Sequence, residues 1–207
     1  MRLSLVVIIL FLVSCSSKSN DEIQLPFYSD PTYTPVWDAK SPHSILPFAL
    51  VNQDSSRVDT KCTRGKIYVA NFFFTTCPSL CPRLTKNLHR VQKAFIDDEN
   101  VLILSHSVTP WIDDVKKLSA YAKRNEINAK TWHLLTGTKK EIYTLARGGY
   151  FADEGFGKQV TLSSDFLHTE NIWLVDTKGH IRGVYNGTLP LEMTRLIEDI
   201  YTLKKLG

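Results

Sequence analysis

Apolar positions along the chain form two long uninterrupted runs and several helical stripes. Residues 66–74 and 101–105 are apolar almost throughout, as expected for strands buried on both faces of a sheet. Between them, residues 84–95 place apolar side chains at i, i+4, i+7 and i+11, which predicts an amphipathic helix. Residues 193–200 repeat this stripe near the end of the chain. Strands that alternate with helices indicate an α/β domain.

Shorter patterns complete the predicted order of elements. We expect strands at 45–50 and 57–60, a helix at 110–124, a strand at 132–135, a helix at 139–146, and strands at 172–176 and 181–185. Thr109 and Pro110 have the residue types of an N-cap and a first helical residue, with Asp113 and Asp114 early in that helix. Residues 150–165 predict an insertion before the last hairpin. This order predicts a thioredoxin-like α/β domain with an added N-terminal β-hairpin.

The first fifteen residues have the pattern of an export signal. Arg2 precedes residues 3–13, which carry no charge, and Ser14 and Cys15 follow. The apolar run is shorter than the roughly 20 residues that span a bilayer, so it predicts the core of a signal peptide. Its end resembles a bacterial lipobox, at which cleavage removes residues 1–14 and a lipid joins the Cys15 thiol. The alternative is an uncleaved anchor. Either way, we expect the domain outside the cytoplasm, in a bacterial cell envelope and tied to a membrane.

Residues 15–42 separate this signal from the predicted domain. They contain four prolines among small polar residues. Proline disfavours helix and favours extended chain. We therefore expect a flexible, lipid-anchored tether with an end-to-end distance of roughly 30 Å. The predicted thioredoxin-like domain would then occupy residues 43–207.

Composition and charge indicate one globular domain and exclude two classes of protein. The chain has 207 residues, of which 43% are hydrophobic and 22% are charged. One domain of this length can bury a core without disulfide bonds, so its four cysteines are free for chemistry. The formal net charge of +4 is too small and too evenly spread for nucleic-acid binding. A mean hydropathy of −0.13 excludes a protein with several membrane spans.

Two cysteines mark the junction between the first long strand and the helix after it. Cys77 and Cys81 lie in the segment 75–82, where ligand sites commonly form in open α/β sheets. Cys81 falls on the apolar stripe of the helix and Cys77 in the preceding loop, so both thiols can face one spot. A helix N-terminus favours thiolate, the form that binds metal or attacks disulfides. Three interpretations follow: structural cysteines, a dithiol oxidoreductase, or a soft-metal site.

The residue that faces the dithiol across the fold separates the last two interpretations. Dithiol oxidoreductases usually have two residues between their cysteines, and this chain has three. Thioredoxin-type reductases place a cis-proline before the strand that leads into the last hairpin, where this chain has His168 and Thr169. Two thiolates and one imidazole suit a copper ion, because thiolates hold Cu(I) and histidine helps the site accept Cu(II). His106, just after the 101–105 strand, is the rival third ligand.

The remaining cysteine and histidines are assigned no role in the site. Cys62 is interpreted as a bystander thiol, with a redox role as the alternative. His43, His89, His133 and His180 are expected to be solvated or structural.

Several motifs together resemble the Sco/SenC/PrrC family of membrane-anchored copper proteins. They are the run 48–54, Gly65-Lys66, the cysteine motif at 77–82, the segment 107–124, Thr136-Gly137, and His168-Thr169 ahead of 173–176. The resemblance implies a thioredoxin-like fold with one copper ion held by Cys77, Cys81 and His168. Family members commonly have an aspartate where Thr109 stands and an acid where Leu167 stands. Any role of those two acids cannot be transferred to this chain.

The resemblance also implies a function in the assembly of cytochrome c oxidase. A membrane-tethered copper chaperone would deliver copper to the binuclear copper site of the oxidase or to another apo-cuproprotein. The alternative is a thiol-disulfide reductase that keeps the oxidase cysteines reduced, with Cys77 attacking and Cys81 resolving. A copper or redox sensor is a third, weaker hypothesis. Because copper transfer needs no turnover, the first hypothesis does not make the chain an enzyme.

Overall fold

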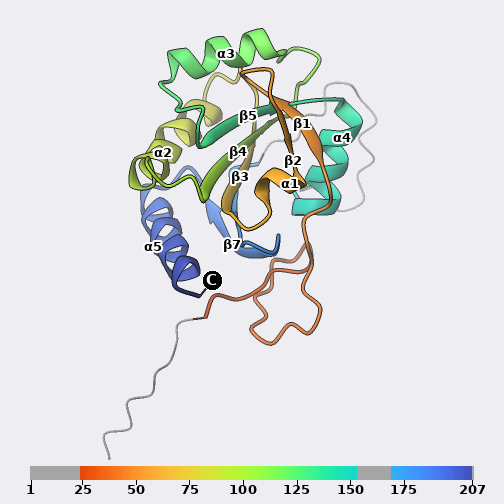
Figure 1. The fold of residues 1–207 in the computed structure, drawn as a ribbon, viewed down its shortest axis with the longest axis vertical. Helices are drawn as coiled ribbons and strands as arrows, with labels where there is room; N and C mark the ends of the chain where they lie inside the picture. Colours follow the sequence, from red (N-terminus) through yellow and green to blue (C-terminus); the bar gives the residue numbers. More distant parts are fainter. Residues whose placement is uncertain (1–23, 153–168, 207) are drawn as a thin grey trace, which may run out of the picture.

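One mixed sheet forms the centre of the molecule. The structure, a computed structural model, describes residues 24–152 and 169–206. The strands in this part of the chain are β1 (Ala49–Asn52), β2 (Arg57–Asp59), β3 (Ile67–Phe73), β4 (Val101–Ser107), β5 (Trp132–Thr136), β6 (Asn171–Val175) and β7 (Ile181–Asn186). They follow the order β2-β1-β5-β4-β3-β6-β7 across the sheet (Figure 1). The two predicted hairpins, one near the start and one near the end of the domain, are β1–β2 and β6–β7.

β3 and β4 lie near the middle of the sheet, as their apolar sequences predict. Every residue of both strands is buried, and the two strands pair in parallel along their full length. The loops that follow them therefore leave from the same end of the sheet. We call this the carboxyl end and the opposite one the amino end.

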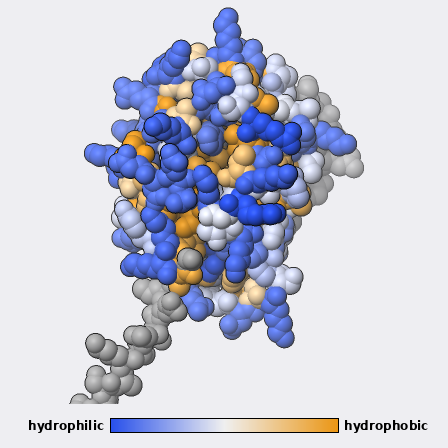
Figure 2. All heavy atoms as spheres, viewed as in Figure 1, coloured by the Kyte–Doolittle hydropathy of each residue, from blue (hydrophilic) through white to orange (hydrophobic). Residues whose placement is uncertain are grey.

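Helices cover both faces of the sheet (Figure 1). They are α1 (Thr60–Thr63), α2 (Leu80–Ala94), α3 (Val115–Arg124), α4 (Lys139–Thr144) and α5 (Pro190–Leu206). α2, α3 and α5 pack their apolar side chains on one face, and α4 packs on the other. The predicted stripe at 193–200 is present in α5, where Met193, Leu196 and Ile200 are buried. Figure 2 shows polar side chains over most of the face seen in Figure 1, with smaller apolar patches among them.

The helix predicted from Pro110 begins five residues later. Asp114 is the N-cap of α3 and accepts a hydrogen bond from the backbone N–H of Lys117 at 2.8 Å. The residues before it form a turn in which the backbone N–H of Asp113 donates to the carbonyl oxygen of Thr109 at 2.9 Å. The predicted N-cap at Thr109 is wrong because the side chain of Asp113 is buried in the interior instead of lying on the first turn of a helix.

The helix predicted at 139–146 also ends later than expected. α4 continues as a π-turn through Gly149. Tyr150 and Ala152 are then buried in the core, so the insertion predicted at 150–165 is wrong at its first residues. The remainder of that segment lies outside the described residues.

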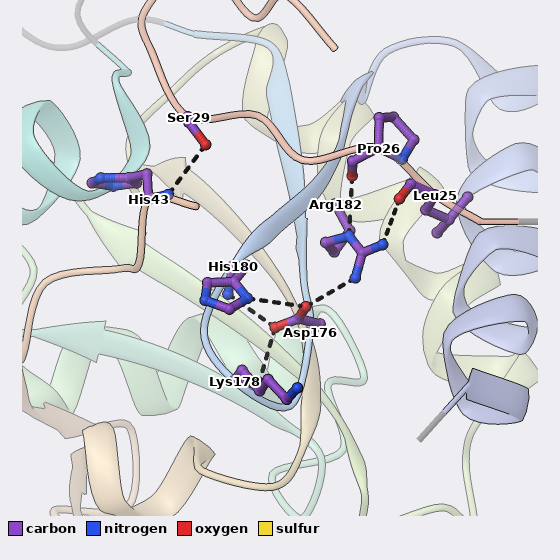
Figure 3. A network of polar contacts seen from close by, with 8 residues as sticks. All are labelled: Leu25, Pro26, Ser29, His43, Asp176, Lys178, His180 and Arg182. Carbon is purple, nitrogen blue, oxygen red and sulfur yellow. Dashed lines mark hydrogen bonds and ion pairs between the residues drawn. The ribbon is translucent and has the colours of Figure 1, made fainter. Parts of the chain in front are cut away.

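Residues 24–44, which we call the N-terminal strap, pack against β7 and the turn before it. Arg182 of β7 donates hydrogen bonds to the backbone carbonyl of Leu25 and, at 3.0 Å, to that of Pro26 (Figure 3). The backbone N–H of Tyr28 donates to the carbonyl of the first residue of β7 at 3.0 Å. The strap is thus fastened at the amino end of the sheet.

The strap corrects the prediction of a flexible tether over 15–42. From residue 24 onward this prediction is wrong, because an extended, proline-rich chain can still donate and accept backbone hydrogen bonds along a strand. The signal peptide predicted at 1–14 and the lipidated Cys15 lie outside the described residues. No helix within 24–152 or 169–206 is long and apolar enough to cross a membrane.

Candidate metal centre

The two predicted thiols meet where β3 leads into α2, at the carboxyl end of the sheet. Cys77 is half-buried in the connecting loop, and Cys81, in the first turn of α2, is only 3% exposed. The backbone N–H of Cys77 donates to the carbonyl of Phe74, and that of Cys81 donates to Sγ of Cys77, each at 3.3 Å. Both cysteines are free thiols. The structure therefore brings them together as the sequence predicts.

The Cys77 thiol is placed to ionise first. Burial, the largest single influence, raises the pKa of Cys77, but hydrogen bonds from the backbone of Cys81, Ser79 and Leu80 and from the Cys81 side chain together outweigh it. The pKa of Cys77 is therefore lowered from its ordinary value. The N–H groups that supply these bonds belong to the first turn of α2, where they have no partner within the helix.

The Cys81 thiol has the opposite tendency. Burial raises the pKa of Cys81 to about 12, and the neighbouring Cys77 and the Asp113 carboxylate add to the increase. A metal cation bound nearby would favour the Cys81 thiolate and lower the pKa of Cys81. Because the Cys81 thiol keeps its proton at neutral pH, a metal ion that binds to it has to displace that proton. One thiol that ionises readily and one that resists suit an attacking and a resolving cysteine, and they equally suit two metal ligands that bind in sequence.

His106, the rival third ligand, does not approach the dithiol. It lies beside Phe72 in the parallel register of β3 and β4, and Phe72 belongs to the core on the opposite face of the sheet from Cys81. The His106 ring is fully buried against Phe48, Phe72 and Tyr150. Burial lowers the pKa of His106 to about 4. This residue is part of the core and is not a ligand.

The predicted third ligand, His168, lies outside the described residues. Its neighbour Thr169 is described, and is buried just before β6. β6 runs antiparallel to β3 and pairs Trp173 with Ala70, so the residues that precede β6 lie toward the carboxyl end. Thr169 therefore lies at the same end of the sheet as the dithiol loop.

Cys62, the third cysteine of the described residues, is distant from this site. Cys62 is exposed on α1, which precedes β3, and its Sγ donates to Oδ1 of Asp59 at 3.5 Å. The length of β3, about 20 Å, separates it from the dithiol. Within residues 24–152 and 169–206, no three His, Cys, Asp or Glu side chains form a group that could hold a metal ion. Two of the three predicted ligands, Cys77 and Cys81, are among these residues.

Asp113 lies near the dithiol, although its sequence pattern predicts a position in the first turn of a helix. The Asp113 carboxylate is fully buried, and Thr75 of the dithiol loop donates to it both its backbone N–H, at 3.1 Å, and its hydroxyl, at 2.5 Å. Asp114 next to it is exposed. Two adjacent acids are the only signal in the sequence, and they are equally typical of a helix N-terminus.

Comparison with known proteins identifies the family. The SCO1/SenC family model matches residues 38–204. The chain belongs to this family. The SCO1 protein homolog of Bacillus subtilis is 28% identical over 166 residues, which cover 79% of this chain and 84% of that protein. The resemblance found in the motifs is thereby confirmed.

Solved structures of Sco proteins have the same fold. A SCO1/SenC family lipoprotein from Bacillus anthracis matches with a TM-score of 0.68 and 27% identity, over 78% of this chain and 95% of that one. BsSco, described as having a disulfide switch and as a member of a family of cytochrome c oxidase assembly proteins, matches with a TM-score of 0.67 and 28% identity, over 80% and 95%. ScoI of Bradyrhizobium japonicum, solved with copper bound, matches with a TM-score of 0.60 and 25% identity, over 76% and 99%. The predicted thioredoxin-like α/β fold is confirmed.

Proposed function

We propose that this chain is a membrane-tethered copper chaperone that binds one copper ion through Cys77, Cys81 and His168. It would supply the binuclear copper site of cytochrome c oxidase or another apo-cuproprotein. The observation that carries the proposal is the pair of adjacent free thiols at the N-terminus of α2, one of them with a lowered pKa. Two relatives support it, namely the copper-bound ScoI and the oxidase assembly protein BsSco.

The donor set fits copper as a cargo. Thiolates are soft ligands that select Cu(I), and an imidazole helps the same site accept Cu(II). Because the Cys81 thiol has to lose its proton on binding, copper affinity is expected to fall as the pH falls. A site at one end of the sheet can also release its ligands one at a time to a partner that offers better ones.

Copper titration of the purified domain tests the ligand set. We expect one equivalent to bind to the wild type and to Cys62→Ser, the control that removes a thiol distant from the site. Cys77→Ser and Cys81→Ser should abolish stoichiometric binding, and His168→Ala should weaken it or lose Cu(II) selectively. Unchanged Cu(II) absorption in His168→Ala would show that His168 is not a ligand. Full binding by Cys77→Ser would overturn the proposal.

The anchor is a separate part of the proposal. Cleavage before Cys15 and lipidation of its thiol would hold the domain outside the cytoplasm on a bacterial membrane, and the lipoprotein from B. anthracis supports this. Membrane fractionation and labelling with a clickable fatty acid test it. The wild type should be membrane-bound and labelled, and Cys15→Ala should be neither. A labelled Cys15→Ala protein would refute lipidation at this residue.

The alternative function is a thiol-disulfide reductase, and the difference in pKa between Cys77 and Cys81 is compatible with it. The Cys77 thiolate would attack a disulfide of the partner and release one partner thiolate. Cys81, losing its proton, would then attack the sulfur of Cys77 and release the second partner thiolate. The partner gains two electrons, and a Cys77–Cys81 disulfide remains.

Exchange kinetics distinguish the two functions. The reduced, metal-free domain is mixed with a peptide that contains the oxidised cysteine pair of an oxidase copper site, and release of peptide thiols is followed. Slow exchange together with tight copper binding supports the chaperone. Fast exchange together with weak copper binding supports the reductase.

A further inference from the structure

The Asp113 carboxylate receives four hydrogen bonds from three residues, one in the dithiol loop and two at or just after the end of β4. Its Oδ2 accepts from the backbone N–H of Thr75 at 3.1 Å, from the hydroxyl of Ser107 at 2.6 Å and from the hydroxyl of Thr109 at 3.0 Å. Its Oδ1 accepts from the hydroxyl of Thr75 at 2.5 Å. The side chain is fully buried. An ionised carboxylate accepts hydrogen bonds at both oxygens and has no proton to donate, which suits these four donors.

These bonds connect the loop that contains the dithiol to the loop beside it. Thr75 lies two residues before Cys77, whereas Ser107 ends β4 and Thr109 follows it. Thr75 is held through both its backbone and its side chain, so the chain direction on entering the Cys77 turn is fixed. Besides these bonds, Phe74 and Cys77 of this loop pack against the core.

We propose that Asp113 is a positioning residue that holds Cys77 beside Cys81 by fixing the dithiol loop to the end of β4. The expected effect on copper affinity rests on the proposed function. The expected effect on the position of the two thiols does not. Within residues 24–152 and 169–206, the hydrogen bonds of the Asp113 carboxylate go to Thr75, Ser107 and Thr109 and not to either thiol. Asp113 acts through Thr75, and the partners it uses in the described part of the chain are an amide and three hydroxyls instead of a cation.

The neighbouring acid provides a matched control. Asp114 has the same side chain one position later, but it is exposed and caps α3. Asparagine caps helices as well as aspartate does, so Asp114→Asn should leave the fold and the dithiol unchanged. In Asp113→Asn, the NH2 of the new amide is a donor and faces groups that donate to the carboxylate in the wild type. The connection between the loops is therefore weakened.

Two readouts test the role on folded protein. The first is the equilibrium of the Cys77–Cys81 disulfide with glutathione, measured without metal. A looser loop lowers the effective concentration of the two thiols, so Asp113→Asn should show a several-fold smaller equilibrium constant for disulfide formation. The second is Cu(I) affinity by chelator competition, which should fall about 10- to 100-fold, the range typical of residues that orient metal ligands. Asp114→Asn should match the wild type in both.

The outcomes separate this inference from the proposed function. A folded Asp113→Asn protein with the disulfide equilibrium of the wild type overturns the positioning role. If the wild type itself fails to bind copper, the proposed function is wrong, but the glutathione equilibrium still tests Asp113. Should Asp113→Asn not fold, Thr75→Val removes one of the four bonds and keeps the backbone one. It should shift the disulfide equilibrium in the same direction, and no shift in that variant overturns the role.

Discussion

Asp113 and Asp176 are buried carboxylates at opposite ends of the sheet, and their surroundings differ. At the amino end, Asp176 pairs with Arg182 at 3.1 Å and accepts the backbone N–H groups of Lys178 and His180 at 3.0 and 2.9 Å (Figure 3). At the carboxyl end, Asp113 accepts one backbone N–H and three hydroxyls. Both side chains have their hydrogen bonds, but only Asp176 has a cation among its partners in the described residues.

The two carboxylates differ in the part of the structure that they stabilise. The Arg182 guanidinium pairs with Asp176 and also binds the backbone of the N-terminal strap, so the ion pair helps to hold the strap against the sheet. Among the residues that the structure describes, no cation pairs with Asp113. The charge of Asp113 contributes, after burial, to the raised pKa of Cys81. It also creates a negative potential near the thiols, which favours a metal cation over a second uncompensated thiolate.

Removing the carboxyl-end carboxylate should have the largest effect on stability. Asp113→Ala leaves three hydroxyls and one amide in the interior without their acceptor. We expect the free energy of unfolding to fall by about 3 kcal/mol, measured by urea denaturation of the reduced, metal-free domain. A loss of less than about 1 kcal/mol would show that these donors find other partners or water.

Removing the amino-end cation should have a smaller and more local effect. Arg182→Met keeps an unbranched apolar side chain but leaves Asp176 with its backbone bonds and the His180 ring at 3.5 Å, and it frees the carbonyls of Leu25 and Pro26. We expect a loss of about 2 kcal/mol, together with faster amide exchange at Tyr28. The glutathione equilibrium of the dithiol should not change. A changed equilibrium would show that the amino and carboxyl ends of the sheet are coupled.

The sequence predicts the parts of this picture that depend on local pattern. The apolar runs of β3 and β4 and the helical spacing in α2 place Cys77 and Cys81 at a strand–helix junction, and the structure confirms this. That position requires only the order of elements and the direction of the strands. Neither depends on contacts between distant residues.

Two contacts of the buried carboxylate networks, Thr75 with Asp113 and Arg182 with Pro26, escaped prediction because residues distant in the sequence form them. The acids at 113 and 114 satisfy the rules for a helix start, and the sequence does not indicate that Thr75, 38 positions away, donates to Asp113. The prolines of the strap correctly indicate extended chain. They do not indicate that Arg182, 156 positions after Pro26, holds it. Such pairings follow from the folded sheet and from no local pattern.

The change in the free energy of unfolding above pH 9 should depend on Asp113 and not on Asp176. The pKa of Cys81 is raised from 9.0 to about 12 in the folded state, so above pH 9 the unfolded chain loses this proton while the folded chain keeps it. The stabilisation is complete below pH 9 and is lost as the pH rises toward 12. In the reduced domain, Asp113→Asn should reduce this loss and Asp176→Asn should not.

Urea denaturation at pH 8 and pH 10 measures this loss, and Cys81→Ser gives the part that comes from other groups. Equal losses in Asp113→Asn and Asp176→Asn would show that the charge of Asp113 does not reach Cys81.

The smallest substitutions compare one hydroxyl at each end. Thr75→Val removes the hydroxyl that donates to Asp113 but keeps the backbone bond, and Ser29→Ala removes the hydroxyl oxygen that accepts the backbone N–H of His43 at 3.1 Å in the strap (Figure 3). Each should cost about 1 kcal/mol of unfolding free energy, because each breaks one hydrogen bond. Only Thr75→Val should weaken Cu(I) binding, since only Thr75 lies in the dithiol loop. If both variants bind Cu(I) as the wild type does, Cys77 is positioned by α2 alone, and the two carboxylates differ only in their partners.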